Sequence, residues 1–265
     1  MPQLVEVQTA VRQMRGKSEA VLVECTNGSH YVLKFRIPRR FLVNELLAAF
    51  LLKYLGVATP EWALVQVPEH ILQNRSGKTA IIRQESCMQA RLLGFGSKFP
   101  GNPGERVVYD FLPRVLLSKQ VENLTDFYGR LLFNLWTGCQ EMGHAIYFRG
   151  RTSGPFCAQM IDNKNILGGL SWKLPNIPLI VANCSARSIY EARPATKVLE
   201  WWAERILTVN EGTLEQAVRQ VPMDWLDGDE QQLDQIMLQL LKRHSQMSTF
   251  ISYFYENSMR YGVLR

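Results

Sequence analysis

A lysine in a predicted strand and a glutamate in the helix that follows are the first residues here that could act together. Lys34 lies between apolar neighbours in YVLKF, and Glu45 follows eleven residues later in FLVNELLAAFLLKYLG. A charged side chain on the inner face of such a strand needs a partner, because an unpaired buried charge costs several kcal/mol. Glu45 is the natural partner, and the paired ammonium would be suited to neutralising phosphate. The alternative is a lysine that snorkels from an edge strand.

A second candidate is an aspartate at the exposed end of an apolar run. Asp162 closes the predicted strand FCAQMID. A carboxylate in this position suits Mg²⁺, because hard cations prefer carboxylate oxygen. The alternative is an aspartate that caps a turn through its side chain.

A third candidate is the turn that contains Gly16, Lys17 and Ser18, between two predicted strands. Its backbone N–H groups could cover phosphates, since consecutive N–H groups in a turn form an anion-binding concavity. The turn has a single glycine, and a plain hairpin turn is the alternative interpretation.

The elements that must position these residues begin with a predicted β-meander over residues 4–35, in which Asn27-Gly28 is a strong hairpin signal. Residues 41–55 are rich in helix formers, are apolar nearly all round and stop at Gly56, which predicts a buried helix. Strand character returns after Pro60. The segment LLGFGSKFPGNPGERVVYDFLP, residues 92–113, is dense in Gly and Pro, so we expect a loop and a lobe boundary there.

The second half of the chain has a helical pattern. The segment NLTDFYGRLLFNLWTG predicts a helix from Asn123 onward, and the short strands AIYF and FCAQMID follow it. Residues 163–185 are expected to be irregular. From about Ala195 the sequence predicts amphipathic helices, which include PATKVLEWWAERILT and TLEQAVRQV.

Composition favours a globular protein. The chain has 265 residues, of which 46% are hydrophobic, enough for one bilobal domain or two small ones. Its five cysteines are scattered without metal-ligand spacing, which favours reduced thiols and argues against zinc. The N-terminal residues lack the uninterrupted apolar region of a secretion signal, and no apolar run reaches the roughly 18 residues of a membrane span. We therefore expect a cytoplasmic protein without membrane association.

The net charge of +6 is spread along the chain. Arg36, Arg39 and Arg40 form its tightest basic group. Such a group is usually a solvated face and only occasionally contacts nucleic acid or another anion, so nucleic-acid binding is the less favoured interpretation.

The order of these segments and their amino-acid sequences resemble those of the HipA-like kinases, specifically the compact branch of that family. The resemblance is carried by HYVLKF, FLVNELLAAFLLKYLGVATPEWALVQV, FGSKFPGNPGERVVYDFLP, FNLWTGCQEMGHAIYF and MIDNKNILGG. It implies an α+β, bilobal, protein-kinase-like fold that binds ATP and Mg²⁺. Residues 1–100 would form an N-lobe of antiparallel β-sheet plus a helix, and residues 101–265 a mainly helical C-lobe.

The resemblance also implies roles for the candidate residues. Lys34 would be the phosphate-binding lysine, Glu45 its partner on the helix, and Asp162 the metal-binding aspartate that opens the activation segment. The turn at residues 16–19 would be the loop that covers the nucleotide.

The predicted catalytic loop departs from the family pattern. Glu141 falls where these kinases have the catalytic aspartate, and Ile146 falls where they have a metal-binding asparagine; in a shortened loop His144 takes the asparagine's place. Glutamate can accept a hydroxyl proton, so Glu141 is the provisional base. An imidazole is a poor ligand for Mg²⁺, which makes slow or absent phosphoryl transfer a serious alternative.

Three functions therefore follow from the sequence. The leading one is an ATP-dependent Ser/Thr-type kinase that phosphorylates a protein hydroxyl. The second is a catalytically impaired pseudokinase that acts as a binding module. The third is a kinase for small molecules or phosphoinositides, since residues 163–194 contain no motif that identifies a substrate.

Overall fold

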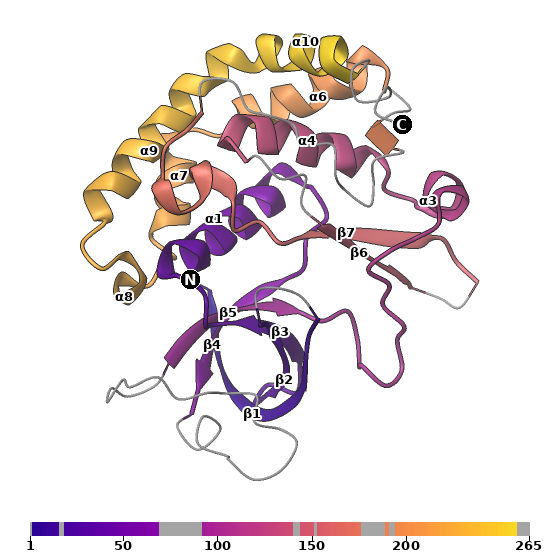
Figure 1. The fold of residues 1–265 in the computed structure, drawn as a ribbon, viewed down its shortest axis with the longest axis vertical. Helices are drawn as coiled ribbons and strands as arrows, with labels where there is room; N and C mark the ends of the chain where they lie inside the picture. Colours follow the sequence, from indigo (N-terminus) through magenta and orange to yellow (C-terminus); the bar gives the residue numbers. More distant parts are fainter. Residues whose placement is uncertain are drawn as a thin grey trace.

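The computed structural model describes residues 2–15, 19–68, 92–139, 144–150, 153–175, 189–190 and 194–258. It contains a β-barrel, a layer of helices and a two-stranded hairpin (Figure 1). The strands are β1 (Gln3–Gln13), β2 (Val21–Cys25), β3 (His30–Lys34), β4 (Trp62–Val67), β5 (Leu92–Lys98), β6 (His144–Arg149) and β7 (Phe156–Ile161). The helices are α1 (Arg39–Leu55), α3 (Arg114–Gln120), α4 (Thr125–Thr137), η1 (Ile166–Ser171), α6 (Thr196–Leu207), α7 (Glu211–Val218), α8 (Met223–Leu226), α9 (Glu230–Lys242), η2 (Arg243–Gln246) and α10 (Met247–Ser258).

Five strands close into a barrel in the order β1-β2-β3-β5-β4. Four of the pairings are antiparallel, in keeping with the predicted antiparallel sheet, although two of them involve β5, and β1 and β4 run parallel from Gln3 opposite Ala63 onward. The long strand β1 makes this closure possible, because its first residues pair with β4 and its residues from Val7 onward pair with β2. Two register shifts in β1 accompany the change of partner, as expected for bulges that increase the curvature of a sheet.

The predicted Asn27-Gly28 hairpin is confirmed. Strand β2 ends at Cys25 and β3 begins at His30, and Glu24 pairs with His30. Gly28 has a φ of 72°, which a residue with a side chain rarely adopts.

The expectation of a loop over residues 92–113 is wrong for its first part, because Leu92–Lys98 is strand β5. Its glycines are sites of close packing rather than chain breaks. A Cβ at Gly94 would lie 2.6 Å from Leu33, and one at Gly96 would lie 2.5 Å from Val65. Glycine therefore lets the barrel close around side chains that point inward.

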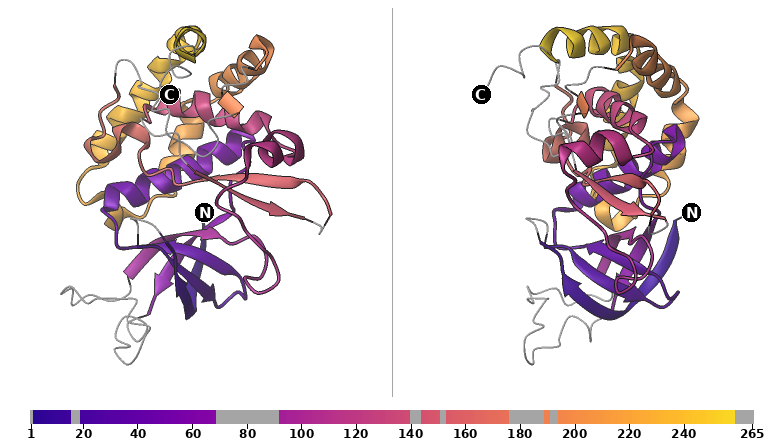
Figure 2. Two further views of the ribbon diagram at one scale, coloured as in Figure 1. Left: turned by 45° about the vertical axis from the view of Figure 1, so that its right-hand side comes forward. Right: turned by 90° about the vertical axis from the view of Figure 1, so that its right-hand side faces the viewer.

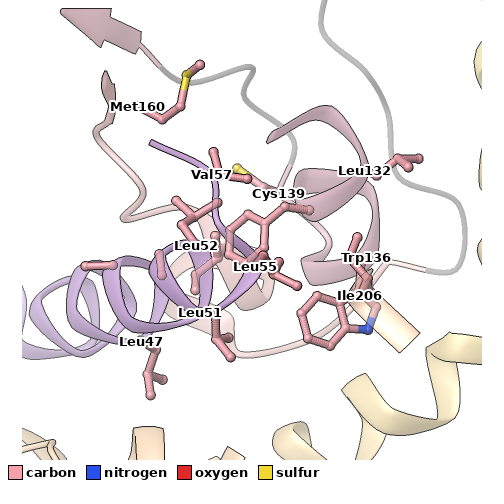
Figure 3. Packing of buried hydrophobic residues seen from close by; sticks show 14 of the residues in the cluster. Leu47, Leu51, Leu52, Leu55, Val57, Leu132, Trp136, Cys139, Met160 and Ile206 are labelled. Atoms are coloured by element: carbon pink, nitrogen blue, oxygen red, sulfur yellow. The ribbon is translucent and has the colours of Figure 1, made fainter. Parts of the chain in front are cut away.

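Helix α1 confirms the predicted buried helix and ends at Gly56, whose φ of 80° and backbone N–H bonds to the last turn form a C-cap. The helix lies between the barrel and the other helices (Figures 1 and 2). Its leucines share a hydrophobic core with α4 and α6, while the barrel has a separate core of its own. Figure 3 shows Leu51 and Leu55 beside Trp136 and Ile206 in this larger core.

The predicted second half also forms. Helix α4 ends at Gly138 in the left-handed conformation, the two short strands pair as the β6–β7 hairpin, and helices α6 to α10 follow. Within the described ranges, no helix has both the length and the apolar character needed to cross a lipid bilayer.

Candidate functional site

Lys34 is the last residue of β3 and points out of the barrel. Its neighbour Leu33 points into the barrel core, and side chains alternate along a strand, so Lys34 faces away from that core. The lysine is nevertheless only 8% exposed. Helix α1 and the chain after β7 supply its ion-pair partners there.

Two carboxylates meet the ammonium group of Lys34. Its Nζ lies 2.5 Å from Glu45 Oε1 and 3.0 Å from Asp162 Oδ1. Burial alone would lower the pKa of Lys34, but the two negative charges outweigh it and raise that pKa above its ordinary value. The lysine is therefore a buried cation, and the predicted ion pair with Glu45 is present.

Glu45 connects the strand lysine to residues 162–172, the segment after β7, which we call the aspartate loop. Its side chain is 2% exposed, and its second oxygen, Oε2, accepts a 3.1 Å hydrogen bond from the backbone N–H of Asn163. Both carboxylate oxygens of Glu45 are thus satisfied. Helix α1 thereby holds Lys34 with one oxygen and the residue after Asp162 with the other.

Asp162 follows the last residue of β7 and has a φ of 60°, in the left-handed region. This conformation is uncommon for a residue with a side chain and is often found where function demands an exact placement. Its carboxylate also contacts Lys164 Nζ at 3.4 Å and remains 24% exposed. Burial would raise the pKa of Asp162, but Lys34 and Lys164 lower it to about 2, so the group is a carboxylate at neutral pH.

His144 opens strand β6 and pairs with Ile161, the residue before Asp162. The hairpin therefore brings His144 next to the aspartate, and its positive form contributes to the lowered pKa of Asp162. Ile146, half-buried further along the same strand, has no atom that could bind a metal. The proposed base Glu141, and the turn with Gly16, Lys17 and Ser18, lie outside the described residues, so their roles remain predictions.

The chemistry of the donor set fits a hard divalent cation bound together with an anionic ligand. No group of three or more His, Cys, Asp or Glu side chains suited to a metal occurs among the described residues. Mg²⁺ commonly binds through one or two carboxylates while phosphates and water complete its shell, so a single ionised aspartate is compatible with it. Beside Asp162, the side-chain oxygen of Asn163 is buried without a hydrogen-bond partner in the described part of the chain.

Sequence reasoning missed a set of polar residues that hold the aspartate loop. Asn44 and Arg40 of α1 bind backbone carbonyls of that loop, and Arg40 also forms a two-pronged ion pair with Asp229 at 2.6 and 2.7 Å. Arg39 of the predicted basic group is paired as well, with Asp227 at 3.3 Å. One signal was visible in the sequence, since Asn44 and Glu45 interrupt the apolar part of the helix.

Comparison of the structure with solved structures identifies the class of fold. The structure is similar to a solved structure described as the Golgi casein kinase, with a TM-score of 0.55, 11% identity, and coverage of 96% of this chain and 74% of that chain. A second, described as the Golgi casein kinase with Mn/ADP bound, matches with a TM-score of 0.44, 13% identity, and coverage of 91% and 72%. The likeness to the first shows that this chain has a kinase-type fold of mixed helices and strands.

The family comparison then agrees with the resemblance predicted from the sequence. Residues 5–106 match the family model described as HipA-like kinase. The match includes Lys34 and Glu45, and it ends before the predicted catalytic loop and Asp162. No curated protein matches the chain.

Proposed function

We propose that this chain is a HipA-like kinase that binds ATP and Mg²⁺ at Lys34, Glu45 and Asp162 and transfers the γ-phosphoryl group to a protein hydroxyl. The observation that carries the proposal is the convergence of these three side chains, from β3, α1 and the end of β7, with both carboxylates within 3.0 Å of the Lys34 ammonium nitrogen. The kinase-type fold and the family match over residues 5–106 support it.

Each residue has a distinct role in the proposal. Lys34 provides a compact positive charge for the α- and β-phosphates, and Glu45 fixes its direction. Asp162 would hold Mg²⁺, which when bound neutralises negative charge on the phosphates. Lys34 bridges both carboxylates, so binding of nucleotide and metal would exchange the contact between Lys34 and Asp162 for contacts to phosphate oxygens and to the metal.

Glu141 is the proposed general base for the transfer. Its carboxylate would accept the proton of the substrate hydroxyl while that oxygen bonds to the γ-phosphorus and the bridging bond to ADP breaks. Its side chain is one methylene longer than aspartate. An error of about 1 Å in such placement can cost on the order of 10²-fold in rate, so we expect slow transfer.

A kinase-fold module that binds nucleotide without transferring phosphate is the second candidate. It is favoured by the residues at the two strand positions that could supply the second metal ligand, because neither is suited to Mg²⁺. His144 is a poor Mg²⁺ ligand, and Ile146 has an alkyl side chain. In this case binding would act through conformation or through docking of a partner.

Transfer of labelled phosphate from ATP in the presence of Mg²⁺, to the chain itself or to added proteins, separates the two candidates. We expect weak incorporation that disappears in Asp162→Ala and Glu141→Gln. Incorporation that survives in both variants would contradict the assigned roles. Nucleotide-dependent thermal stabilisation of the native protein without any transfer would favour the binding module.

A matched pair of lysine variants tests the phosphate-binding role. Lys34→Met should lose the stabilisation by ATP. Lys98→Met, which removes an exposed lysine from the same barrel, should keep it. Equal responses of the two variants would place the nucleotide elsewhere.

A further inference from the structure

Asn44 is a buried polar residue on the face of α1 that meets the aspartate loop. Its side-chain nitrogen lies 2.6 Å from the carbonyl oxygen of Lys164, 3.0 Å from that of Ile166 and 3.2 Å from that of Gly169. Its side-chain oxygen accepts a 2.9 Å hydrogen bond from the indole N–H of Trp172. An amide has two N–H groups, so at least one of them is shared between carbonyls.

The segment that Asn44 binds has a backbone that does not hold its shape by itself. Asp162, Leu167 and Trp172 all have positive φ although each carries a side chain, and Gly168 and Gly169 have positive φ as well. Such conformations are unfavourable for L-residues and persist only where surrounding contacts impose them. Residues 167–169 interrupt the helical geometry, so the segment does not satisfy its carbonyl groups as a regular helix would, and external donors must satisfy some of them.

Two further contacts from the same helix act on this segment. Glu45 accepts the backbone N–H of Asn163, and Arg40 donates to the carbonyl of Leu170 at 2.8 Å. Arg40 lies four residues before Asn44, which puts both on one side of α1. The helix that carries the partner of Lys34 thus also contacts the aspartate loop at its start, middle and end.

We propose that Asn44 is a positioning residue that holds the Asp162 carboxylate ready for a divalent cation, an inference that rests on the proposed nucleotide and metal site. Asn44 does not touch the reacting groups. Its three contacts fix the chain after Asp162, and the Trp172 N–H fixes which way the amide faces. Loss of these contacts would let the loop relax and move the carboxylate, while the Lys34–Glu45 pair remains in place.

The test is to measure two affinities separately: ADP without metal, and Mn²⁺ in the presence of saturating ADP, the latter by electron paramagnetic resonance of free Mn²⁺. Asn44→Asp keeps the shape and the acceptor for Trp172, but replaces the donor with an oxygen that faces three carbonyls. We expect Mn²⁺ affinity to fall by about tenfold or more, as loss of several hydrogen bonds from a buried group implies. ADP affinity without metal should change by less than about twofold, because Lys34 keeps its partner.

Trp172→Phe is the second variant, in case Asn44→Asp does not fold. It removes only the bond that orients the amide and should lower Mn²⁺ affinity by roughly threefold with ADP affinity unchanged, since a single neutral hydrogen bond is lost. Unchanged Mn²⁺ affinity in both variants, or an equal loss of ADP and Mn²⁺ affinity, would overturn the positioning role. Failure of the native protein to bind ADP or Mn²⁺ at all would instead refute the proposed function on which this role depends.

Discussion

Removing Lys34 should destabilise the protein more than removing Glu45, because Lys34 binds two carboxylates, whereas Glu45 binds one cation and one backbone N–H. Loss of one partner of a buried ion pair typically costs about 3–5 kcal/mol. In Lys34→Met the carboxylates of Glu45 and Asp162 lose their shared cation, so we expect a cost near the upper end, about 5 kcal/mol. In Glu45→Leu, Lys34 keeps Asp162 at 3.0 Å while the backbone N–H of Asn163 loses its acceptor, so we expect about 4 kcal/mol.

The double variant Lys34→Met/Glu45→Leu should cost much less than the two single changes together, since it removes both buried charges of the pair. We expect a coupling energy of roughly 2–3 kcal/mol, as found for residues in one buried network. Urea unfolding of the four proteins without ligand, followed by circular dichroism, measures it.

An exposed pair in the same barrel provides the control. Lys98 and Glu61 lie 2.8 Å apart, a similar separation, but their side chains are 40% and 67% exposed. The same cycle on Lys98 and Glu61 should therefore give no more than about 1 kcal/mol. Additive effects at Lys34 and Glu45, or equal coupling in both cycles, would refute the view that burial gives this pair its strength.

Three further predictions concern acid, the backbone and the loop contacts. The pKa of Asp162 is lowered from 3.8 to about 2, so its ionised form adds stability above pH 4 that is lost as the pH falls toward 2. The free energy of unfolding, measured across this range, should fall by about 2 kcal/mol, and this loss should be absent in Asp162→Asn. Gly168 and Gly28 both have positive φ, but a Cβ at Gly168 would lie 2.1 Å from a backbone oxygen, whereas a Cβ at Gly28 would have no atom within 4 Å. Gly168→Ala should therefore lower the melting temperature clearly more than Gly28→Ala. Arg40→Ala should lower the free energy of unfolding in urea by about 1–2 kcal/mol, because it removes a two-pronged ion pair. Arg39→Ala removes a more exposed single contact and should lower it by less than about 0.5 kcal/mol. Equal losses in the two variants would contradict this difference.

The sequence predicted the core of the site because its signals are local. Lys34 stands out as a charge among apolar strand residues, and Glu45 is one of few polar residues on a buried helix. Their contact could be expected since the strand leads directly into the helix. That Asp162 would lie in the same site as Lys34 followed only from the family resemblance, because the two residues are 128 positions apart, and their direct contact was not predicted.

Other features could not be read from local patterns. Gly94 and Gly96 look like chain breakers, and their role in strand β5 depends on side chains from neighbouring strands. The parallel pairing of β1 with β4 depends on how the chain returns after α1. Asn44 was visible as a polar residue in an apolar helix, but its partners, the loop carbonyls more than 100 residues away, were not.

Helix α1 belongs to the predicted N-lobe of residues 1–100, and its leucines pack in one core with α4 and α6. This packing gives a physical basis for the long-range contacts of the site. A helix fixed to the C-terminal helices presents Asn44 and Glu45 to the aspartate loop on one side, and Glu45 to the barrel lysine.

A crystal structure of the protein with Mg²⁺ and a non-hydrolysable ATP analogue tests the central claim most directly. We predict that Lys34 Nζ contacts phosphate oxygens while it stays bound to Glu45, and that a carboxylate oxygen of Asp162 lies about 2.1 Å from the metal, as Mg²⁺ coordination requires. A nucleotide bound elsewhere, or phosphates that contact neither Lys34 nor a metal on Asp162, would contradict the account.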